Sequence, residues 1–348
     1  VIDPELRLPI TELDMVEITE QNVVVKLTVA GCPAAQRIEA DVRAAVAEFD
    51  ISITMSVMNQ TERDALKAKL RNGRAPRQNP FDADTLTRVY LVGSGKGGVG
   101  KSSVTANLAV TLAEKGFRVG LVDADIFGFS IPGQLGIADK PTRVDEMILP
   151  PVAFGVKVIS IGMFLDDNKP VAWRGPMLHR AIQQFLTDVY WGDLDFLLVD
   201  LPPGTGDVAI SLGQQLPTAK SIVITTPQLA AAEVAERSGA VGLQTGQSIL
   251  GVIENMSWLV QPDGSKLELF GTGGGADVAE RLSRLSGAAV PVLGQIPLSI
   301  ALREGSDTGN PISLSNPDDP AAIAIREIAE KISQDKIGLA GKKLRVSL

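Results

Sequence analysis

Apolar residues along this chain form short runs that alternate with stretches of helical periodicity. The runs that predict buried strands occupy residues 89–92, 117–122, 156–163, 196–199, 221–226, 249–253 and 290–296. Helical spacing lies between them, as at Val104, Leu108 and Leu112 and over residues 229–242. Strands that alternate with helices predict an α/β fold with a doubly wound, mostly parallel sheet.

The first 68 residues have a pattern of their own, which predicts a small α/β domain. Residues 23–29 are β-rich, Pro33 suits a first helical turn, and residues 51–58 alternate like a half-buried strand. The helix between these strands is expected to bury one face, which carries Ile38, Val42, Val46 and Phe49.

Residues 69–85 are polar and rich in turn-forming pairs such as Asn72-Gly73 and Asn79-Pro80, which predicts a linker. Its arginines are expected to be solvated, namely Arg71, Arg74 and Arg77. The chain is therefore expected to divide into the small domain at 1–68, the linker at 69–85, a larger domain at 86–335 and a tail at 336–348.

The predicted strand at 89–92 continues into a glycine-rich loop that reads G-K-G-G-V-G-K-S over residues 95–102. This string satisfies the phosphate-binding pattern G-x-x-x-x-G-K-[ST], in which backbone N–H groups and a helix N-terminus surround phosphate oxygens. Lys101 is expected to reach the β- and γ-phosphates of ATP, and the Ser102 hydroxyl to bind Mg²⁺. The expected nucleotide-binding residues of the loop are Gly95, Lys96, Gly97, Gly98, Val99, Gly100, Lys101, Ser102 and Ser103.

Two later strands end in carboxylates. The run at 117–122 is followed by Asp123 and Asp125, and the run at 196–199 by Asp200 and a Pro/Gly-rich loop. Because doubly wound sheets bind ligands at the carboxyl ends of their strands, these side chains are expected near the phosphates. Asp200 matches a Walker B aspartate that holds Mg²⁺, and Asp123 is expected to serve Mg²⁺ or its own loop.

Charge and composition exclude several function classes. The net charge of −8 argues against a nucleic-acid partner, and no apolar run is long enough for a membrane span, so neither partner is expected. A cytoplasmic location fits. With one cysteine and one histidine, the chain cannot form an internal disulfide or a metal site of several thiolates or histidines. Cys32 is either a small buried hydrophobe or, near a helix N-terminus, a reactive thiol.

Lys96, directly after Gly95, is not required by the ordinary phosphate loop. The form G-K-G-G-V-G-K-S resembles the deviant loop of the MinD, ParA, nitrogenase-iron-protein and Mrp ATPases, in which the extra lysine contacts nucleotide across a dimer. The resemblance implies an ATPase that acts as a homodimer, with Lys96 supplied to the partner's phosphates. It also implies that Asp125 orients the attacking water.

Other segments resemble the Mrp/Nbp35-like (ApbC-type) iron–sulfur cluster carriers. These are W-R-G-P-M at 173–177, which contains Arg174, and G-V-I-E-N-M-S at 251–257. The resemblance implies that Asn255 hydrogen-bonds the adenine and that Pro297 packs beside it. The D-P-E-L string at 3–6 and T-V-A-G-C-P at 28–33 resemble the small domain of SufT-like iron–sulfur assembly factors. The implied activity is slow, Mg²⁺-dependent ATP hydrolysis that serves iron–sulfur client or assembly proteins.

One feature of those carriers is missing. Many members have Cys-x-x-Cys after the asparagine strand, so that a dimer offers four thiolates to a [4Fe–4S] cluster. Here Gln261 and Gly264 stand in that segment, and a stably held cluster is not expected. The alternatives are a non-cluster cargo, a MinD- or ParA-like positioning ATPase, and a small-molecule P-loop kinase.

Overall fold

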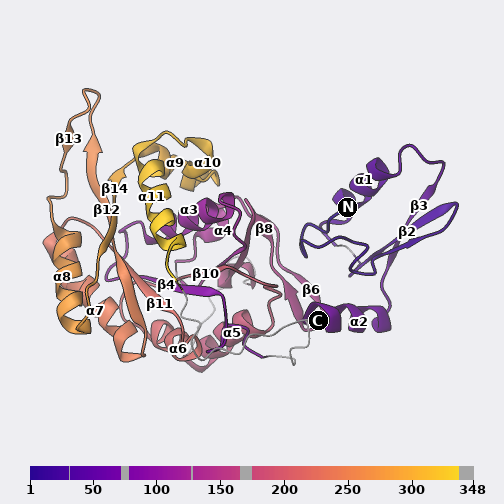
Figure 1. The fold of residues 1–348 in the computed structure, drawn as a ribbon, viewed down its shortest axis with the longest axis horizontal. Helices are drawn as coiled ribbons and strands as arrows, with labels where there is room; N and C mark the ends of the chain where they lie inside the picture. The colour runs from indigo at the N-terminus through magenta and orange to yellow at the C-terminus, as the bar shows by residue number, and fades with distance from the viewer. Residues whose placement is uncertain (31, 72–77, 127, 165–174, 337–348) are drawn as a thin grey trace. The chain divides into compact units, whose positions relative to one another are not determined.

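The structure is a computed structural model of the whole chain. It describes residues 1–30, 32–71, 78–126, 128–164 and 175–336, without the side chains of 175–176 and 229–233 (Figure 1). The chain forms two compact units. The first consists of Val1–Gln78, Asp139–Val152 and Thr187–Gly192, and the second of Asn79–Ala138, Ala153–Leu186 and Asp193–Leu348.

The first unit contains a three-stranded sheet in the order β1-β2-β3 and a separate hairpin of β6 and β7. Strand β2 runs antiparallel to β1 and parallel to β3, and helix α1 makes the crossover between β2 and β3. The elements are β1 Val16–Ile18, β2 Asn22–Leu27, α1 Ala35–Ala45, β3 Ser52–Val57, α2 Gln60–Arg71, β6 Thr142–Val144 and β7 Met147–Leu149.

Helix α1 buries Ile38 and Val42 as its periodicity predicts, but it ends at Ala45. Phe49 lies beyond that end and is 64% exposed, so its predicted place on the buried face is wrong. Helical spacing predicts a shared face only within a helix, and Phe49 lies after the last helical residue.

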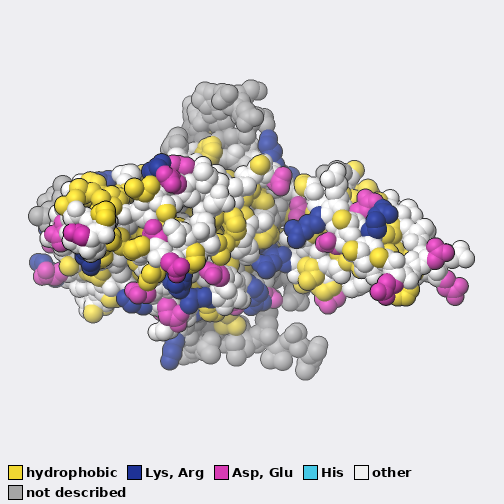
Figure 2. Space-filling model, turned by 90° about the horizontal axis from the view of Figure 1, so that it is seen from above, with side chains coloured by type: hydrophobic (Ala, Val, Ile, Leu, Met, Phe, Trp, Pro, Cys, Tyr) yellow, Lys and Arg dark blue, Asp and Glu magenta, His cyan; other side chains and the backbone are white. Residues whose placement is uncertain are grey.

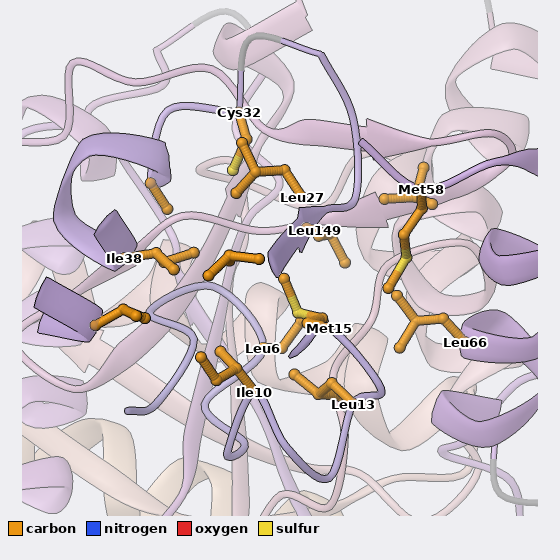
Figure 3. Close-up of a cluster of buried hydrophobic side chains, with 14 of the residues drawn as sticks. Leu6, Ile10, Leu13, Met15, Leu27, Cys32, Ile38, Met58, Leu66 and Leu149 are labelled. Carbon is orange, nitrogen blue, oxygen red and sulfur yellow. The ribbon is translucent and has the colours of Figure 1, made fainter. Parts of the chain in front are cut away.

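The core of the first unit gathers buried side chains from segments that lie far apart in the sequence (Figure 3). The cluster includes Cys32 together with residues of the N-terminal segment and of α1 and α2, and the hairpin adds Val144, Met147 and Leu149. The first unit therefore includes residues 139–152 and 187–192, which the sequence pattern assigns to the larger domain at 86–335.

Helix α2 extends into the stretch predicted as a linker and is bonded to the hairpin. Lys67 Nζ lies 2.7 Å from Asp145 Oδ2, and Arg71 Nη2 lies 2.6 Å from Glu146 Oε1. The expectation that Arg71 is solvated is therefore wrong, whereas Arg74 and Arg77 lie outside the described residues.

The second unit is built on a nine-stranded sheet in the order β13-β12-β11-β4-β10-β5-β9-β8, with β14 also paired to β12. The strands are β4 Arg88–Ser94, β5 Val119–Asp123, β8 Val152–Ala153, β9 Val156–Ser160, β10 Phe196–Asp200, β11 Lys220–Thr225, β12 Ser248–Val260, β13 Lys266–Leu267 and β14 Val292–Leu298. The strand pairs from β9 through β12 to β14 are parallel, and β13 alone is recorded antiparallel to its neighbour.

Helices cover both faces of this sheet, which confirms the predicted doubly wound fold (Figure 1). One face carries α3 Lys101–Glu114, α4 Ile131–Gln134, α9 Ile300–Thr308, α10 Ile312–Ser315 and α11 Pro320–Ser333. The other carries α5 Gly175–Thr187, α6 Asp207–Gln215, α7 Leu229–Gln244 and α8 Gly274–Ser286. The strand predicted at 156–163 is shorter, because a 3₁₀ turn, η1 Ile161–Phe164, follows β9. None of the helices in the described ranges combines the length and apolarity that a bilayer crossing requires.

Candidate functional site

The loop between β4 and α3 can follow its path only because particular positions are glycine. Gly100 has a φ of 78°, a left-handed conformation that favours glycine, and a Cβ there would lie 2.3 Å from Asn255 Nδ2. At Gly95 a Cβ would lie 2.2 Å from the backbone carbon of Val234, at the start of the described part of α7. These glycines allow the loop to pass close to Asn255 and α7 before it enters the first turn of α3. The N-terminus of a helix such as α3 attracts anions.

Asp200 stands at the end of β10 and is the point at which the cationic and hydroxyl groups of the site converge. Its Oδ2 lies 2.7 Å from Lys101 Nζ and accepts a hydrogen bond from Ser102 Oγ at 2.6 Å. Its Oδ1 accepts from Thr105 Oγ1 at 3.0 Å. Burial raises the pKa of the Asp200 carboxyl, and the Lys101 ammonium opposes the rise.

Thr105 is a site residue that the sequence reasoning missed. It is fully buried on α3, four residues after Lys101, and its hydroxyl also lies 2.8 Å from the Lys101 carbonyl oxygen. The available signal was the i, i+4 relationship, which puts the two residues on the same face of the helix.

Asp123 lies beside Asp200, because β5 and β10 pair in parallel register at these two residues. Its Oδ2 accepts hydrogen bonds from the backbone N–H of Ser130 at 3.1 Å and of Ile131 at 3.2 Å, and from Ser160 Oγ at 3.1 Å. Burial, followed by the charge of Asp200, raises the pKa of Asp123 to about 7. These contacts hold the loop after β5, whereas a role of Asp123 toward Mg²⁺ stays a prediction.

The rest of that loop is fastened at two further points. Asp125 Oδ1 accepts a hydrogen bond from the Gly128 N–H at 2.9 Å. The ring of Phe129 lies over Gly162, where a Cβ would come within 2.3 Å of the ring. Asp125 is therefore at the predicted strand end, but its carboxylate is engaged by its own loop.

The other residues predicted to contact nucleotide surround the phosphate loop. Lys96 is half-buried, and its Nζ donates to Gln228 Oε1 at 2.9 Å. Asn255 is buried and donates from Nδ2 to the Val99 carbonyl oxygen at 2.9 Å, and its backbone pairs with Ile296, the residue before Pro297. The structure thus brings Asn255 to the loop and puts Pro297 on the paired strand β14, while their contacts with adenine stay a prediction.

Cys32 lies in the core of the first unit and is only 6% exposed. Its Sγ donates to Glu5 Oε2 at 3.7 Å, and burial, followed by the charge of Glu5, raises the pKa of the thiol to about 11. Helix α1 begins at Ala35, and a hydrogen bond from the backbone N–H of Ala34 lowers the pKa of the thiol by less than burial raises it. The structure thus has Cys32 as a buried thiol, whereas a reactive role for it stays a prediction.

Two predicted features do not contribute to the described site. Arg174 lies outside the described residues. His179 is exposed on α5, with Nδ1 2.6 Å from Ser211 Oγ. Across the described ranges, no group of three or more His, Cys, Asp or Glu side chains could hold a metal ion.

The segment with Gln261 and Gly264 forms the turn between β12 and β13. The Gly264 N–H donates to the Gln261 carbonyl oxygen at 2.9 Å. Exposed apolar side chains follow this hairpin at Val260, Leu267, Leu269 and Phe270. Figure 2 shows that hydrophobic side chains also gather elsewhere on the surface, between charged ones. The hairpin thus presents apolar surface and no thiol.

Two family models match the chain. NUBPL iron-transfer P-loop NTPase matches residues 85–333, and Iron-sulfur cluster assembly protein matches residues 1–57. Among curated relatives, the Iron-sulfur cluster carrier protein of Mycobacterium tuberculosis is 55% identical over 99% of this chain and 93% of its own length. The protein of the same name from Synechocystis is 38% identical over 98% of this chain and 96% of its own length.

Solved structures resemble the second unit. A nucleotide-binding protein from Archaeoglobus fulgidus in complex with ADP superposes with a TM-score of 0.57 and 36% identity, covering 66% of this chain and 89% of that one. The septum site-determining protein MinD of Pyrococcus horikoshii, complexed with Mg-ADP, superposes with a TM-score of 0.54 and 26% identity. The match covers 73% of this chain and 98% of that one.

Proposed function

The chain belongs to the family of NUBPL iron-transfer P-loop NTPases, and from this premise we propose that it hydrolyses ATP in order to carry or assemble iron–sulfur clusters. Relatives at 55% and 38% identity, both named Iron-sulfur cluster carrier protein, support the proposal over nearly the whole chain. The match of residues 1–57 to an iron–sulfur cluster assembly model is consistent with both units serving one function.

The observation that carries the nucleotide part is the convergence of Lys101 and Ser102 on the buried carboxylate of Asp200. A hydroxyl and a carboxylate are the hard oxygen ligands that Mg²⁺ prefers, so Ser102 and Asp200 fit the ion, directly or through water. When bound, Mg²⁺ neutralises charge on the β- and γ-phosphates. Lys101 adds a cation and the loop N–H groups add donors, which together stabilise charge that develops on the transferred phosphoryl group.

We further propose that hydrolysis is slow and needs a homodimer. Lys96 is half-buried and its Nζ contacts the neutral amide of Gln228, so in a dimer its ammonium would turn to the partner's phosphates. Asp125 would orient the attacking water once its loop closes on the γ-phosphate. A two-fold dimer makes both sites equivalent and dependent on each other.

This chain lacks the Cys-x-x-Cys thiolates that would hold a cluster in related carriers. Gln261 and Gly264 offer no sulfur, and two copies of Cys32 give a dimer only two thiolates, fewer than a [4Fe–4S] cluster needs. We therefore propose that this chain binds a cluster only transiently and together with an assembly or client protein that supplies further ligands. The acidic net charge of −8 argues against nucleic acid, and a cytoplasmic location without a membrane partner stays a prediction.

The nucleotide part is tested with Lys101→Ala. Loss of the ammonium should lower Mg²⁺-dependent phosphate release from ATP by about 100-fold or more. Lys115→Ala, at the other end of α3, removes only the ion pair with Glu330 and serves as the matched control. Full hydrolysis by Lys101→Ala would refute the assignment.

The cargo part is tested by anaerobic reconstitution with iron and sulfide. Wild type and Cys32→Ser should both lose their iron on gel filtration, whereas an added apo client protein should gain a cluster faster in the presence of the wild type and ATP. If the wild type retained stoichiometric iron and sulfide in the absence of a client protein, the proposal that it holds a cluster only transiently would be contradicted.

A further inference from the structure

The hairpin of β6 and β7 belongs to the first unit by its packing but lies between two parts of the nucleotide site in the sequence. It follows the loop held by Asp123 and the short helix α4, and it precedes β9. Its side chains Val144, Met147 and Leu149 are buried in the core of the first unit. The loop after β5 and a hairpin fixed in the core of the first unit are therefore joined by a short stretch of chain, residues 131–141.

A second segment of the first unit leads to the other side of the nucleotide site. Residues 187–192 precede β10, the strand that ends in Asp200. This segment is bonded to the hairpin, because the Ile148 N–H donates to the Asp188 carbonyl oxygen at 2.8 Å and the Tyr190 N–H donates to the Ile148 carbonyl oxygen at 2.8 Å. Segments that lead to both Asp123 and Asp200 thus meet at the hairpin.

The hairpin also contacts the environment of Cys32. Thr142, the first residue of β6, donates its hydroxyl to Glu5 Oε1 at 2.6 Å, and Glu5 Oε2 accepts from the Cys32 thiol at 3.7 Å. The two oxygens of the Glu5 carboxylate therefore accept from different groups, one from the hairpin and the other from the cysteine. Because hydrogen bonds weaken steeply with distance and angle, a small shift of Thr142 changes how Glu5 is held.

The turn of the hairpin is tied to helix α2 of the same unit. The ties are the ion pairs of Asp145 with Lys67, whose side chain is 8% exposed, and of Glu146 with Arg71. Since packed cores have discrete arrangements and do not deform continuously, a displaced hairpin is expected to move as a unit.

We propose that nucleotide bound at the phosphate loop controls the reactivity of the Cys32 thiol through the β6–β7 hairpin and the Thr142–Glu5 hydrogen bond. ATP opens the Thr142–Glu5–Cys32 contact, and the thiol becomes accessible. This inference rests on the proposed ATP binding. By linkage, a group that binds reversibly to Cys32 changes the affinity for ATP by the same factor as ATP changes the affinity for that group.

The test uses the fact that Cys32 is the single cysteine of the chain, so alkylation reports on it alone. Iodoacetamide labelling of the full-length protein is followed by mass spectrometry without nucleotide, with Mg-ADP, and with a non-hydrolysable ATP analogue and Mg²⁺. The analogue should accelerate labelling about fivefold or more, which is the lower end of typical allosteric coupling. Equal or slower labelling in protein that binds the analogue would overturn the inference.

Matched variants locate the coupling. Thr142→Val removes the hydroxyl at nearly constant shape and should abolish the response to the analogue, whereas Thr142→Ser should keep it. Should Thr142→Val fail to fold, Asp145→Asn loosens the hairpin at Lys67 and should reduce the response. A full response in folded Thr142→Val would also overturn the inference.

Binding of the analogue is measured in the same samples by a fluorescent competitor. Absence of binding refutes the proposed function itself, while binding without any change in labelling refutes only the coupling.

Discussion

The Thr105 hydroxyl donates to Oδ1 of Asp200, the carboxylate oxygen that neither Lys101 nor Ser102 contacts. Because Asp200 is fully buried, that oxygen has no access to water. Thr105→Val, which has nearly the same shape, should leave the oxygen unsatisfied and lower the free energy of unfolding by about 1–3 kcal/mol. It should also raise the Mg²⁺ concentration needed for half-maximal ATP hydrolysis.

Urea unfolding and a Mg²⁺ titration of phosphate release measure these two effects. Thr105→Ser keeps the hydroxyl and should restore the Mg²⁺ dependence. A valine variant as stable as the wild type, with the same Mg²⁺ dependence, would show that Thr105 does not position Asp200.

Asp123→Asn should loosen the loop after β5. Asp123 Oδ2 accepts from the N–H groups of Ser130 and Ile131 and from Ser160 Oγ, while Oδ1 accepts from the Asp125 N–H. Since an amide has only one oxygen, one set of donors would face an NH₂ group, at an expected loss of about 1–3 kcal/mol in the free energy of unfolding. Limited proteolysis at residues 125–131 should become faster at unchanged secondary structure.

Ser160→Ala, which removes a single donor to Asp123, is the milder control for that experiment and should cost about 1 kcal/mol. The idea that Asp123 holds the loop fails if Asp123→Asn leaves both unfolding and proteolysis unaltered.

Mixing variants should reveal whether Lys96 acts on the partner's nucleotide. Lys96→Ala and Lys101→Ala should each be inactive alone. In a mixed dimer, one site keeps its own Lys101 and receives Lys96 from the partner, so an equimolar mixture should recover about a quarter of the wild-type rate of phosphate release. A mixture that forms dimers but remains inactive would place Lys96 in its own subunit's site.

The pH dependence of alkylation should distinguish folded from unfolded Cys32. Burial raises the pKa of the thiol from its ordinary value near 9.0 to about 11, so the folded state favours the protonated form. The corresponding stabilisation is present below about pH 9 and is lost as the pH rises toward 11. Iodoacetamide labelling of the native protein should therefore rise toward pH 11, whereas in urea it should rise about two pH units earlier.

Glu5→Gln removes the charge that adds to the rise in the pKa of Cys32 and should move the labelling profile to lower pH. Identical profiles in native buffer and in urea would mean that the thiol is not shielded.

Much of the nucleotide site was predictable because it depends on local rules. The spacing from Gly95 to Ser102 defines the loop, and the ends of parallel strands meet at one edge, so Asp123 and Asp200 were expected together and do pair in register. Thr105 was missed because threonine on a buried helix face has no distinctive pattern, and only the position of β10 gives it a partner. Phe49 was assigned to the buried face because periodicity does not reveal where a helix ends.

The sequence by itself determined the fold class, the phosphate loop and the acidic strand ends, since each follows from short-range patterns of residue type. Only the tertiary structure decided that residues 139–152 belong to the first unit and that Cys32 is a buried thiol bonded to Glu5. The reason is that burial and charge depend on every group packed around a side chain. Thr142 lies 137 residues from the carboxylate it contacts, a distance at which no local pattern carries information.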